Sequence, residues 1–116
     1  MYAGVTRYHF LPERMNDAKR VFHDEGLGPK QQLDGYLGCL FLGDPETGSA
    51  LAVDFWLEEE CARRFQGNGG LGRLVAALQP FFSTAADRPV GYEVLLADRV
   101  GWLREEELGG GEVPIG

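Results

Sequence analysis

The chain contains 116 residues, of which 44% are hydrophobic and 25% are charged, as in an ordinary globular domain. Its formal net charge of -7 argues against a nucleic-acid partner and against adsorption to anionic membranes, because both need clustered Lys and Arg. No apolar run approaches the roughly 20 residues that cross a bilayer, and the first residues lack the pattern of a signal peptide. We therefore expect one cytoplasmic domain with no nucleic-acid or membrane partner.

The first elements in chain order are a strand and a helix. Residues 2–10 are rich in β-branched and aromatic side chains and predict a strand. An apolar face with helical spacing predicts a helix over residues 13–26, and Gly26, Gly28 and Pro29 predict its end. The residues of that face are Met15, Ala18, Val21, Phe22 and Gly26.

The stretch 36–42 predicts a second strand, and it carries no charged residue on either side. Alternate side chains of a strand lie on opposite faces, so a half-buried strand should alternate apolar and polar residues. Both faces of this sheet are therefore expected to be covered. Residues 43–48 are dense in turn formers, and residues 50–56 predict the partner strand of a hairpin.

Two more helices and a last strand follow. Residues 58–60 are acidic and open a helix that residues 67–70 interrupt. Residues 71–82 predict another helix, and residues 90–97 predict a strand. The apolar side of the earlier helix is formed by Cys61, Ala62 and Phe65.

This order of elements predicts an α+β, ferredoxin-like β-α-β-β-α-β domain over residues 1–97, with a four-stranded antiparallel sheet and helices on one face. The other face should not remain exposed to water, so we expect a homodimer in which two sheets form a dimeric α/β barrel. In the tail, residues 98–116, we expect Trp102 and Leu103 to dock on the body or the partner, and the last residues to be loose. The residues expected on the covered face are Val5, Leu37, Val53, Phe55 and Leu95.

Four pieces of the chain, within residues 1–97, together resemble the antibiotic biosynthesis monooxygenase family of the dimeric α/β-barrel superfamily. They are Met1-Tyr2-Ala3-Gly4-Val5-Thr6, Asp34-Gly35-Tyr36-Leu37-Gly38, Thr47-Gly48-Ser49-Ala50-Leu51-Ala52 and Phe55-Trp56-Leu57-Glu58-Glu59-Glu60. That family includes oxygenases that act on polyketide phenols or quinols without metal or flavin, a haem-degrading branch, and members of no known activity. The resemblance implies a pocket between sheet and helices and no cofactor. The haem-degrading branch is expected to have Asn in place of Thr6 and a His within the stretch that matches residues 71–76, and neither is present.

Trp56 and Asp54 are the first candidates for catalysis. By the resemblance, Trp56 borders the pocket, where an indole can stack on a flat substrate and donate one hydrogen bond; filling space beneath the second helix is the alternative. Asp54 shares a strand face with Trp56 and can be a base with a raised pKa, or it can pair with Arg7 or Arg73.

Other candidates would bind the substrate or stabilise its anion. Cofactor-free oxygenation needs a deprotonated substrate, because the anion gives an electron to dioxygen, and Arg73, Tyr92 or Trp56 can stabilise that anion. Thr6, Tyr8 and Tyr92 share one side of the sheet if the first and last strands are neighbours; aromatic core packing is the alternative. Phe65 and Leu71 are expected to complete the substrate-binding wall.

The histidines and cysteines are weaker candidates. His9 ends the first strand, where a neutral imidazole can act as a base; a hydrogen-bonded surface His is the alternative. His23 is expected to be solvated beside Asp24. Cys39 and Cys61 are expected to be buried apolar residues, and the spacing of Cys and His predicts no metal site.

Two functions therefore remain open from the sequence. One is a cofactor-independent monooxygenase of a small aromatic or quinol substrate, which requires a usable base in a pocket lined by Trp56, Thr6, Tyr8 and Tyr92. The other is a non-enzymatic dimer that binds a small apolar ligand, or a stress or accessory protein, which requires a pocket that is apolar throughout. Asn68 and the glycines around it form either a mobile lid over the pocket or a plain helix break.

Overall fold

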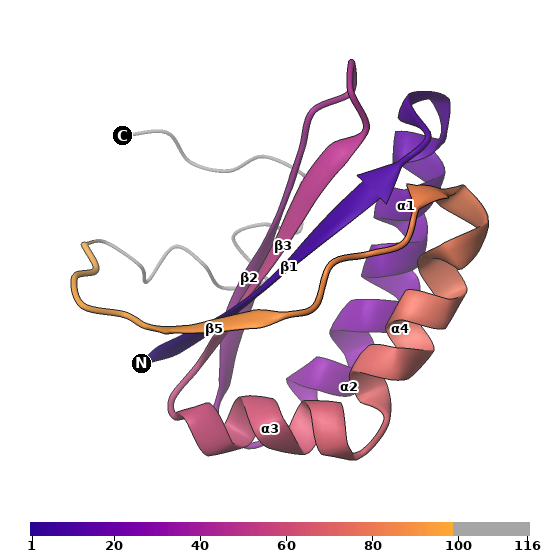
Figure 1. Ribbon diagram of the computed structural model, residues 1–116. Helices are drawn as coiled ribbons and strands as arrows, with labels where there is room; N and C mark the ends of the chain where they lie inside the picture. The colour runs from indigo at the N-terminus through magenta and orange to yellow at the C-terminus, as the bar shows by residue number, and fades with distance from the viewer. Residues whose placement is uncertain (99–116) are drawn as a thin grey trace.

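The computed structural model describes residues 1–98, which form one curled antiparallel sheet with helices on one of its faces (Figure 1). The strands are β1 (Tyr2–Phe10), β2 (Tyr36–Gly43), β3 (Ser49–Trp56), β4 (Phe82–Thr84) and β5 (Val90–Glu93). The long strands lie in the order β2-β3-β1, and both β4 and β5 pair with the other edge of β1. This arrangement confirms the predicted α+β, ferredoxin-like fold.

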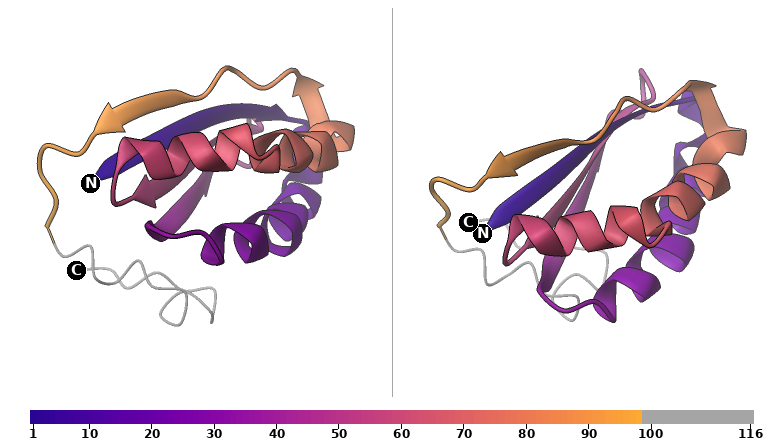
Figure 2. Two further views of the ribbon diagram at one scale, coloured as in Figure 1. Left: turned by 90° about the horizontal axis from the view of Figure 1, so that it is seen from below. Right: turned by 60° about the horizontal axis from the view of Figure 1, so that its bottom comes forward.

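All helices of the described residues lie on the same face of the sheet (Figure 1). They are α1 (Met15–Val21), the π-helical segment η2 (Phe22–Leu27), α2 (Gly28–Gln31), α3 (Glu59–Gly67) and α4 (Gly70–Leu78), with 3-10 turns at Pro12–Arg14 and Gln79–Phe81. The arm from α1 to α2 runs beside α4, and α3 crosses one end of the sheet (Figure 2). None of the helices within residues 1–98 combines the length and apolarity that a bilayer crossing requires.

The arm from α1 to α2 is longer than the sequence predicts. The prediction that the helix ends at Gly26 is wrong, because helical structure continues through η2 and α2 to Gln31. Gly26 serves close packing instead, since a Cβ there would lie 3.2 Å from Cδ1 of Leu74 on α4. Pro29 lies in the first turn of α2, directly after the π-helical segment η2, and does not end the arm. The continued arm carries Lys30 into the interior.

The break between the two later helices is confirmed. Gly69 has a φ of 83° and forms the N-cap of α4, and the side-chain oxygen of Asn68 accepts a hydrogen bond from the N–H of Gly70 at 2.8 Å. Glycine adopts the left-handed backbone conformation at little cost, so the chain turns here without strain. The corner sets α3 across the end of the sheet while α4 follows its face (Figure 2).

The fourth strand position is split, which the sequence does not predict. The prediction of a continuous strand over residues 90–97 is wrong, because β5 ends at Glu93 and β4 lies at the other end of β1. Residues 85–89 span the gap, where the N–H of Asp87 donates to the carbonyl of Arg7 at 2.9 Å. The expected sheet position of Leu95 is therefore also wrong, and this side chain is 90% exposed.

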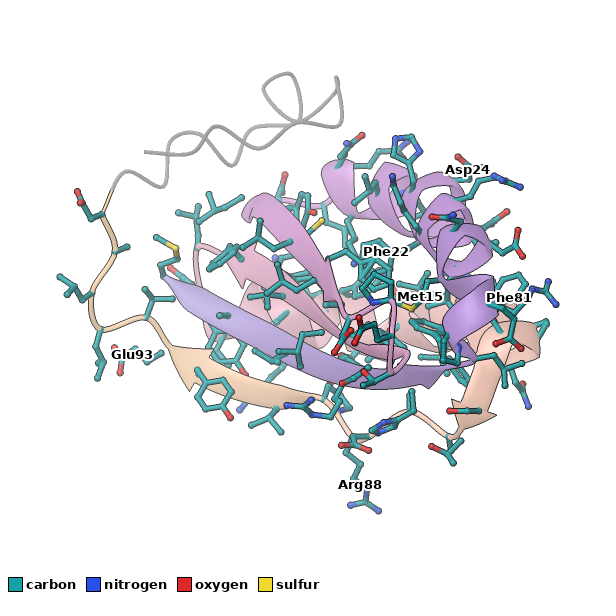
Figure 3. All side chains as sticks on the ribbon, turned by 90° about the horizontal axis from the view of Figure 1, so that it is seen from above. Met15, Phe22, Asp24, Phe81, Arg88 and Glu93 are labelled. Carbon is teal, nitrogen blue, oxygen red and sulfur yellow. The ribbon has the colours of Figure 1, made fainter. Side chains whose placement is uncertain are left out.

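Two apolar clusters fill the space between the sheet and the helices. The larger contains Tyr8 and Phe10 of β1 with Phe22, Leu74 and Leu78 of the helices. The smaller contains Trp56 with Ala62 and Phe65 of α3. Phe22 points into this space, whereas Asp24 of the same segment points outward (Figure 3).

The opposite face of the sheet is mostly apolar, with Arg7, His9 and Ser49 at one end, and no helix within residues 1–98 covers it (Figure 1). The register places the odd-numbered residues of β1 and β3 there. Its partly exposed or exposed apolar residues include Val5, Leu51, Val53, Phe55, Leu37, Leu42, Val90 and Tyr92. The expected tail contacts of Trp102 and Leu103 fall outside the described residues.

Gly48 ends the turn between β2 and β3, and its substitution by Ala should destabilise the protein. Its φ is 82°, and a Cβ there would overlap the carbonyl oxygen of Phe10, so we expect Gly48→Ala to lower the free energy of unfolding by about 2 kcal/mol or more. Urea unfolding followed by circular dichroism measures this loss. Gly72→Ala on α4 is the matched control, because no atom lies within 4 Å of its Cβ position, and it should leave the protein equally or more stable.

Candidate functional site

A buried ion pair joins the first helical arm to the middle of the sheet. Nζ of Lys30 on α2 donates to both carboxylate oxygens of Asp54 on β3, at 2.9 and 3.1 Å. Lys30 is fully buried, and the side chain of Asp54 is 14% exposed. The ammonium also lies 4.7 Å from the ring centre of Phe22 and 5.3 Å from that of Phe65. One carboxylate and two ring faces therefore compensate the loss of water around this charge.

The carboxyl of Asp54 is held in an environment that favours its protonated form. Burial raises the pKa of Asp54, and the nearby Lys30 ammonium opposes the rise only in part. The folded state thus holds this proton more tightly than the unfolded chain does. Asp54 therefore contributes its full stabilisation of the folded state at pH values below an ordinary aspartate pKa of ~3.9. This stabilisation is lost as the pH rises through the raised pKa of Asp54.

Tyr8 adds a polar atom with an unused hydrogen-bonding capacity. It lies on the same face of β1 as Thr6, is 0% exposed, and its hydroxyl has no hydrogen-bond partner in the structure. Burial raises the pKa of Tyr8, and the charge of Asp54 adds to the rise. The hydroxyl is therefore a neutral donor, and a buried donor without an acceptor is costly.

A small cavity of about 20 Å³ lies beside Asp54 and Trp56. That volume suits about one water molecule. Gly4 lies directly opposite Asp54 in the β1–β3 register, and no atom lies within 4 Å of the position that its Cβ would take. The lining residues are Gly4, Thr6, Asp54, Trp56, Ala62, Phe65, Gln66, Leu71 and Pro89.

The rim of the cavity is built from the split strand position and from α3. Pro89 precedes β5, and Gln66 lies in the last turn of α3; both are exposed, whereas the cavity-lining Trp56 is 1% exposed. Residues 85–89 replace regular strand pairing along the middle of β1, and Pro89 of this segment lines the cavity. Within residues 1–98, no three side chains of His, Cys, Asp and Glu gather closely enough to hold a metal ion.

The structure brings five of the predicted site residues together around the cavity. These are Trp56, Asp54, Thr6, Phe65 and Leu71. Tyr8 joins them on the same face of the sheet, close enough for the charge of Asp54 to act on its hydroxyl. The roles that the sequence suggests for these residues remain predictions.

Tyr92, His9 and Arg73 lie elsewhere. β5 neighbours β1 as expected, but Tyr92 is paired with Ala3 and is 55% exposed, so the expectation that it shares the side of Thr6 is wrong. Nε2 of His9 lies 3.0 Å from Oδ1 of Asp87 and ties the segment 85–89 to β1. Arg73 is exposed and donates to the backbone carbonyl of Asn68 at 3.3 Å.

Lys30 is the residue that sequence reasoning missed. The partner expected for Asp54 was an arginine, Arg7 or Arg73, and the structure places Lys30 there instead. A signal was present, because Phe22, Gly26 and Lys30 are spaced four residues apart and so share one helical face. This spacing points to Lys30 only if the predicted helix extends past Gly26.

Removal of the Lys30 charge alone should strongly destabilise the protein. Lys30→Met leaves a buried carboxylate without its partner, so we expect the free energy of unfolding to fall by about 3–5 kcal/mol. The double variant Lys30→Met/Asp54→Leu should recover most of the loss, because neither charge remains. Urea unfolding measures both changes. Lys19→Met on the exposed side of α1 is the control, and a single Lys30→Met variant as stable as the parent would contradict the burial.

The comparisons with known proteins bear on the fold. No family model matches the sequence, and no curated protein matches it. Among solved structures, the chain resembles a monooxygenase from the gene ActVA-Orf6 of Streptomyces coelicolor in complex with nanaomycin D, with a TM-score of 0.71 and 14% identity over 84% of this chain and 89% of that one.

Two further solved structures have a similar fold. SnoaB, a cofactor-independent oxygenase from Streptomyces nogalater, matches with a TM-score of 0.66 and 15% identity over 83% of this chain and 94% of that one. A candidate antibiotic biosynthesis monooxygenase from Caulobacter crescentus matches with a TM-score of 0.68 and 16% identity over 82% of this chain and 90% of that one. The chain therefore has the fold of the antibiotic biosynthesis monooxygenases, at low sequence identity.

Proposed function

We propose that this protein is a cofactor-independent monooxygenase of a small aromatic or quinol substrate. The observation that carries the proposal is the Asp54–Lys30 pair, which places a base and a cation in a nearly dry site beside Trp56. A burial-raised pKa suits Asp54 to accept a proton from a weakly acidic substrate. The fold shared with named monooxygenases supports the same reading.

The chemistry assigns a simple task to each residue. Asp54 takes a proton from the substrate, and the resulting anion passes one electron to dioxygen. The substrate radical and superoxide combine into a peroxide anion, which takes the proton back from Asp54. The resulting hydroperoxide loses water. For an activated methylene the balance is R₂CH₂ + O₂ → R₂C=O + H₂O, so the substrate itself supplies every electron. Trp56 presents an indole against which a flat substrate can stack, and Lys30 stabilises the anion electrostatically.

A substrate of this size requires the cavity to open, because about 20 Å³ accommodates only a water molecule. Two segments beside the lining residues lie outside regular strand pairing. One is the corner at Asn68 and Gly69 between α3 and α4, and the other is the segment 85–89, which one backbone hydrogen bond and the His9–Asp87 pair hold to β1. We assign the opening to these two segments.

A non-enzymatic binding protein is the second candidate, and one observation favours it. Lys30 already occupies both oxygens of Asp54, so the closed site presents a neutralised pair rather than a free base. The rest of the cavity is lined mainly by apolar or aromatic groups, including Phe65 and Leu71. Such a site can hold a small ligand without any reaction, in a stress or accessory role.

Both candidates require a homodimer in our proposal. The apolar face of the sheet opposite the helices carries Val53 and Phe55 at its centre, and no helix within residues 1–98 covers it. Contiguous apolar surface of this kind is characteristic of an interaction site. A second copy of the same sheet offers a matching apolar surface and closes a dimeric barrel.

Oxygen uptake with a panel of quinols tests the proposed activity. We expect uptake that Asp54→Asn lowers about 100-fold or more, because the proton acceptor is lost, and that Trp56→Phe also lowers. The rate should rise as pH increases through the raised pKa of Asp54, since only the ionised carboxylate accepts a proton. His23→Gln on the exposed side of the arm should change nothing. Absence of uptake with every quinol would favour the binding protein.

Sedimentation at micromolar concentration tests the dimer. The parent should sediment as a dimer, and Val53→Glu should convert it to a folded monomer, because a buried carboxylate at the sheet interface has no partner. Ala76→Glu, on the exposed side of α4, is the matched control and should leave the dimer intact. A monomeric parent with an exposed sheet face would exclude the barrel.

A further inference from the structure

An open groove of about 410 Å³ lies where the start of β1, the end of β5 and the start of α3 meet (Figure 1). Tyr2 and Glu93 are partners in the β1–β5 register, and Tyr2 packs against the apolar cluster of Trp56. The groove is therefore on the helix side of the sheet, away from the apolar face that a second copy is proposed to cover. Its lining residues are Met1, Tyr2, Leu57, Glu58, Glu59 and Glu93.

The floor of the groove is apolar and exposed. Leu57 is 58% exposed, and its N–H donates to the carbonyl of Gly35 at 2.8 Å, so its backbone is anchored at this position. Met1, which is also exposed, and the ring of Tyr2 line the groove beside it. Large apolar side chains that gather in one exposed groove are characteristic of an interaction site.

The rim of the groove has two carboxylates without a cation. Within residues 1–98, no ion pair joins Glu58 or Glu93 to a cationic group, whereas Glu59 is paired with Arg63 at 2.8 Å. Glu58 is the N-cap of α3, but its side chain makes no capping hydrogen bond. A segment with an apolar centre and a positive charge on each side of it is therefore complementary to this groove.

The chain carries such a segment directly after the described residues. It has two arginines and no acidic residue over six positions, although the whole chain has a net charge of -7. A Trp and a Leu lie between the arginines, and the acidic residues 105–107 follow at once. The segment is Arg99-Val100-Gly101-Trp102-Leu103-Arg104.

We propose that residues 99–104 fold back and dock in this groove as a strap. Trp102 then covers the apolar floor beside Leu57, and the two arginines supply the cations that Glu58 and Glu93 lack. The inference goes beyond the proposed function and does not depend on it, because it involves neither the cavity beside Asp54 nor a reaction.

The length of the connection permits this return. Glu93 itself lines the groove, and the N–H of Val94 donates to the carbonyl of Met1 at 2.9 Å, so the chain leaves β5 at the groove. Residues 94–101 separate Glu93 from Trp102, a connection that spans about 30 Å when extended. Half of that length can lead away from the sheet and half can lead back.

A docked strap also acts on the interior. It covers Tyr2, which packs against the cluster that contains Trp56, Ala62 and Phe65. The strap therefore holds the end of the sheet against α3 from outside, next to the wall of the candidate site.

The fluorescence of Trp102 tests the docking. The chain has two tryptophans, so the difference between each protein and its own Trp102→Phe counterpart isolates the emission of Trp102. In the parent we expect this emission to lie to the blue of that of N-acetyltryptophanamide, with weaker quenching by acrylamide. Glu58→Lys/Glu93→Lys should abolish both the shift and the protection. Addition of Arg99→Glu/Arg104→Glu to that variant should restore them, because the ion pairs form again with their signs exchanged.

Two further variants separate docking from effects on α3. Glu60→Lys is the matched control, because Glu60 also lies in the first turn of α3 but does not line the groove, so the helix dipole is affected in the same way. It should leave the emission of Trp102 unchanged. Leu57→Ser removes the exposed floor without a change of charge and should release Trp102 in a protein that remains folded by circular dichroism.

The Val53→Glu monomer decides whose groove the strap occupies. Protection of Trp102 that persists in this variant, or in the parent if the parent is itself monomeric, supports docking within one chain. Protection that is lost on dissociation would assign the groove to the tail of a second copy and overturn the proposal. The proposal is equally overturned if Trp102 of the parent is quenched like N-acetyltryptophanamide, if Glu58→Lys/Glu93→Lys leaves it protected, or if the exchange of charges fails to restore protection.

Discussion

One buried ammonium constrains most of this small domain. Lys30 reaches the interior only because the first helical arm continues through η2 into α2, and it stays there because Asp54 and the rings of Phe22 and Phe65 surround it. Those partners come from β3, the arm and α3, so the ion pair ties the first helical arm to β3 and to the helix that follows β3. A buried charge is stable only when all its partners are in place. The site is therefore sensitive to any shift of the helices.

An irregularity of the sheet forms part of the cavity wall beside that pair. A continuous fourth strand would seal the edge of β1, but β4 and β5 cover only its two ends. Residues 85–89 cross between them, and both Pro89 and Gln66 of α3 line the cavity. His9 and Asp87 then act as a clasp on this segment. His9, a candidate base from the sequence, thus has a structural role outside the cavity.

The two faces of the sheet divide the chemistry from the assembly. The helix face carries Thr6, Tyr8 and Asp54, whereas the opposite face carries apolar residues such as Val53 and Phe55. Strand alternation alone separates the two sets, so a sheet can keep a polar site on one side and an apolar surface on the other. The proposed second copy would cover the apolar face without touching the cluster around Lys30.

Sequence patterns alone determined the strands β1 and β3, the hairpin, the helix break near Gly69, and the shared face of Asp54 and Trp56, because alternation and turn chemistry act over a few residues. They did not place Lys30, since Gly26 reads locally as a stop and only Leu74 on a distant helix explains it. Sequence patterns also did not show on which face of the sheet Tyr92 lies, because that face follows from the pairing of β5 with β1. Tertiary structure alone decided which cation neutralises Asp54, because contact across 24 residues depends on how helices pack on the sheet.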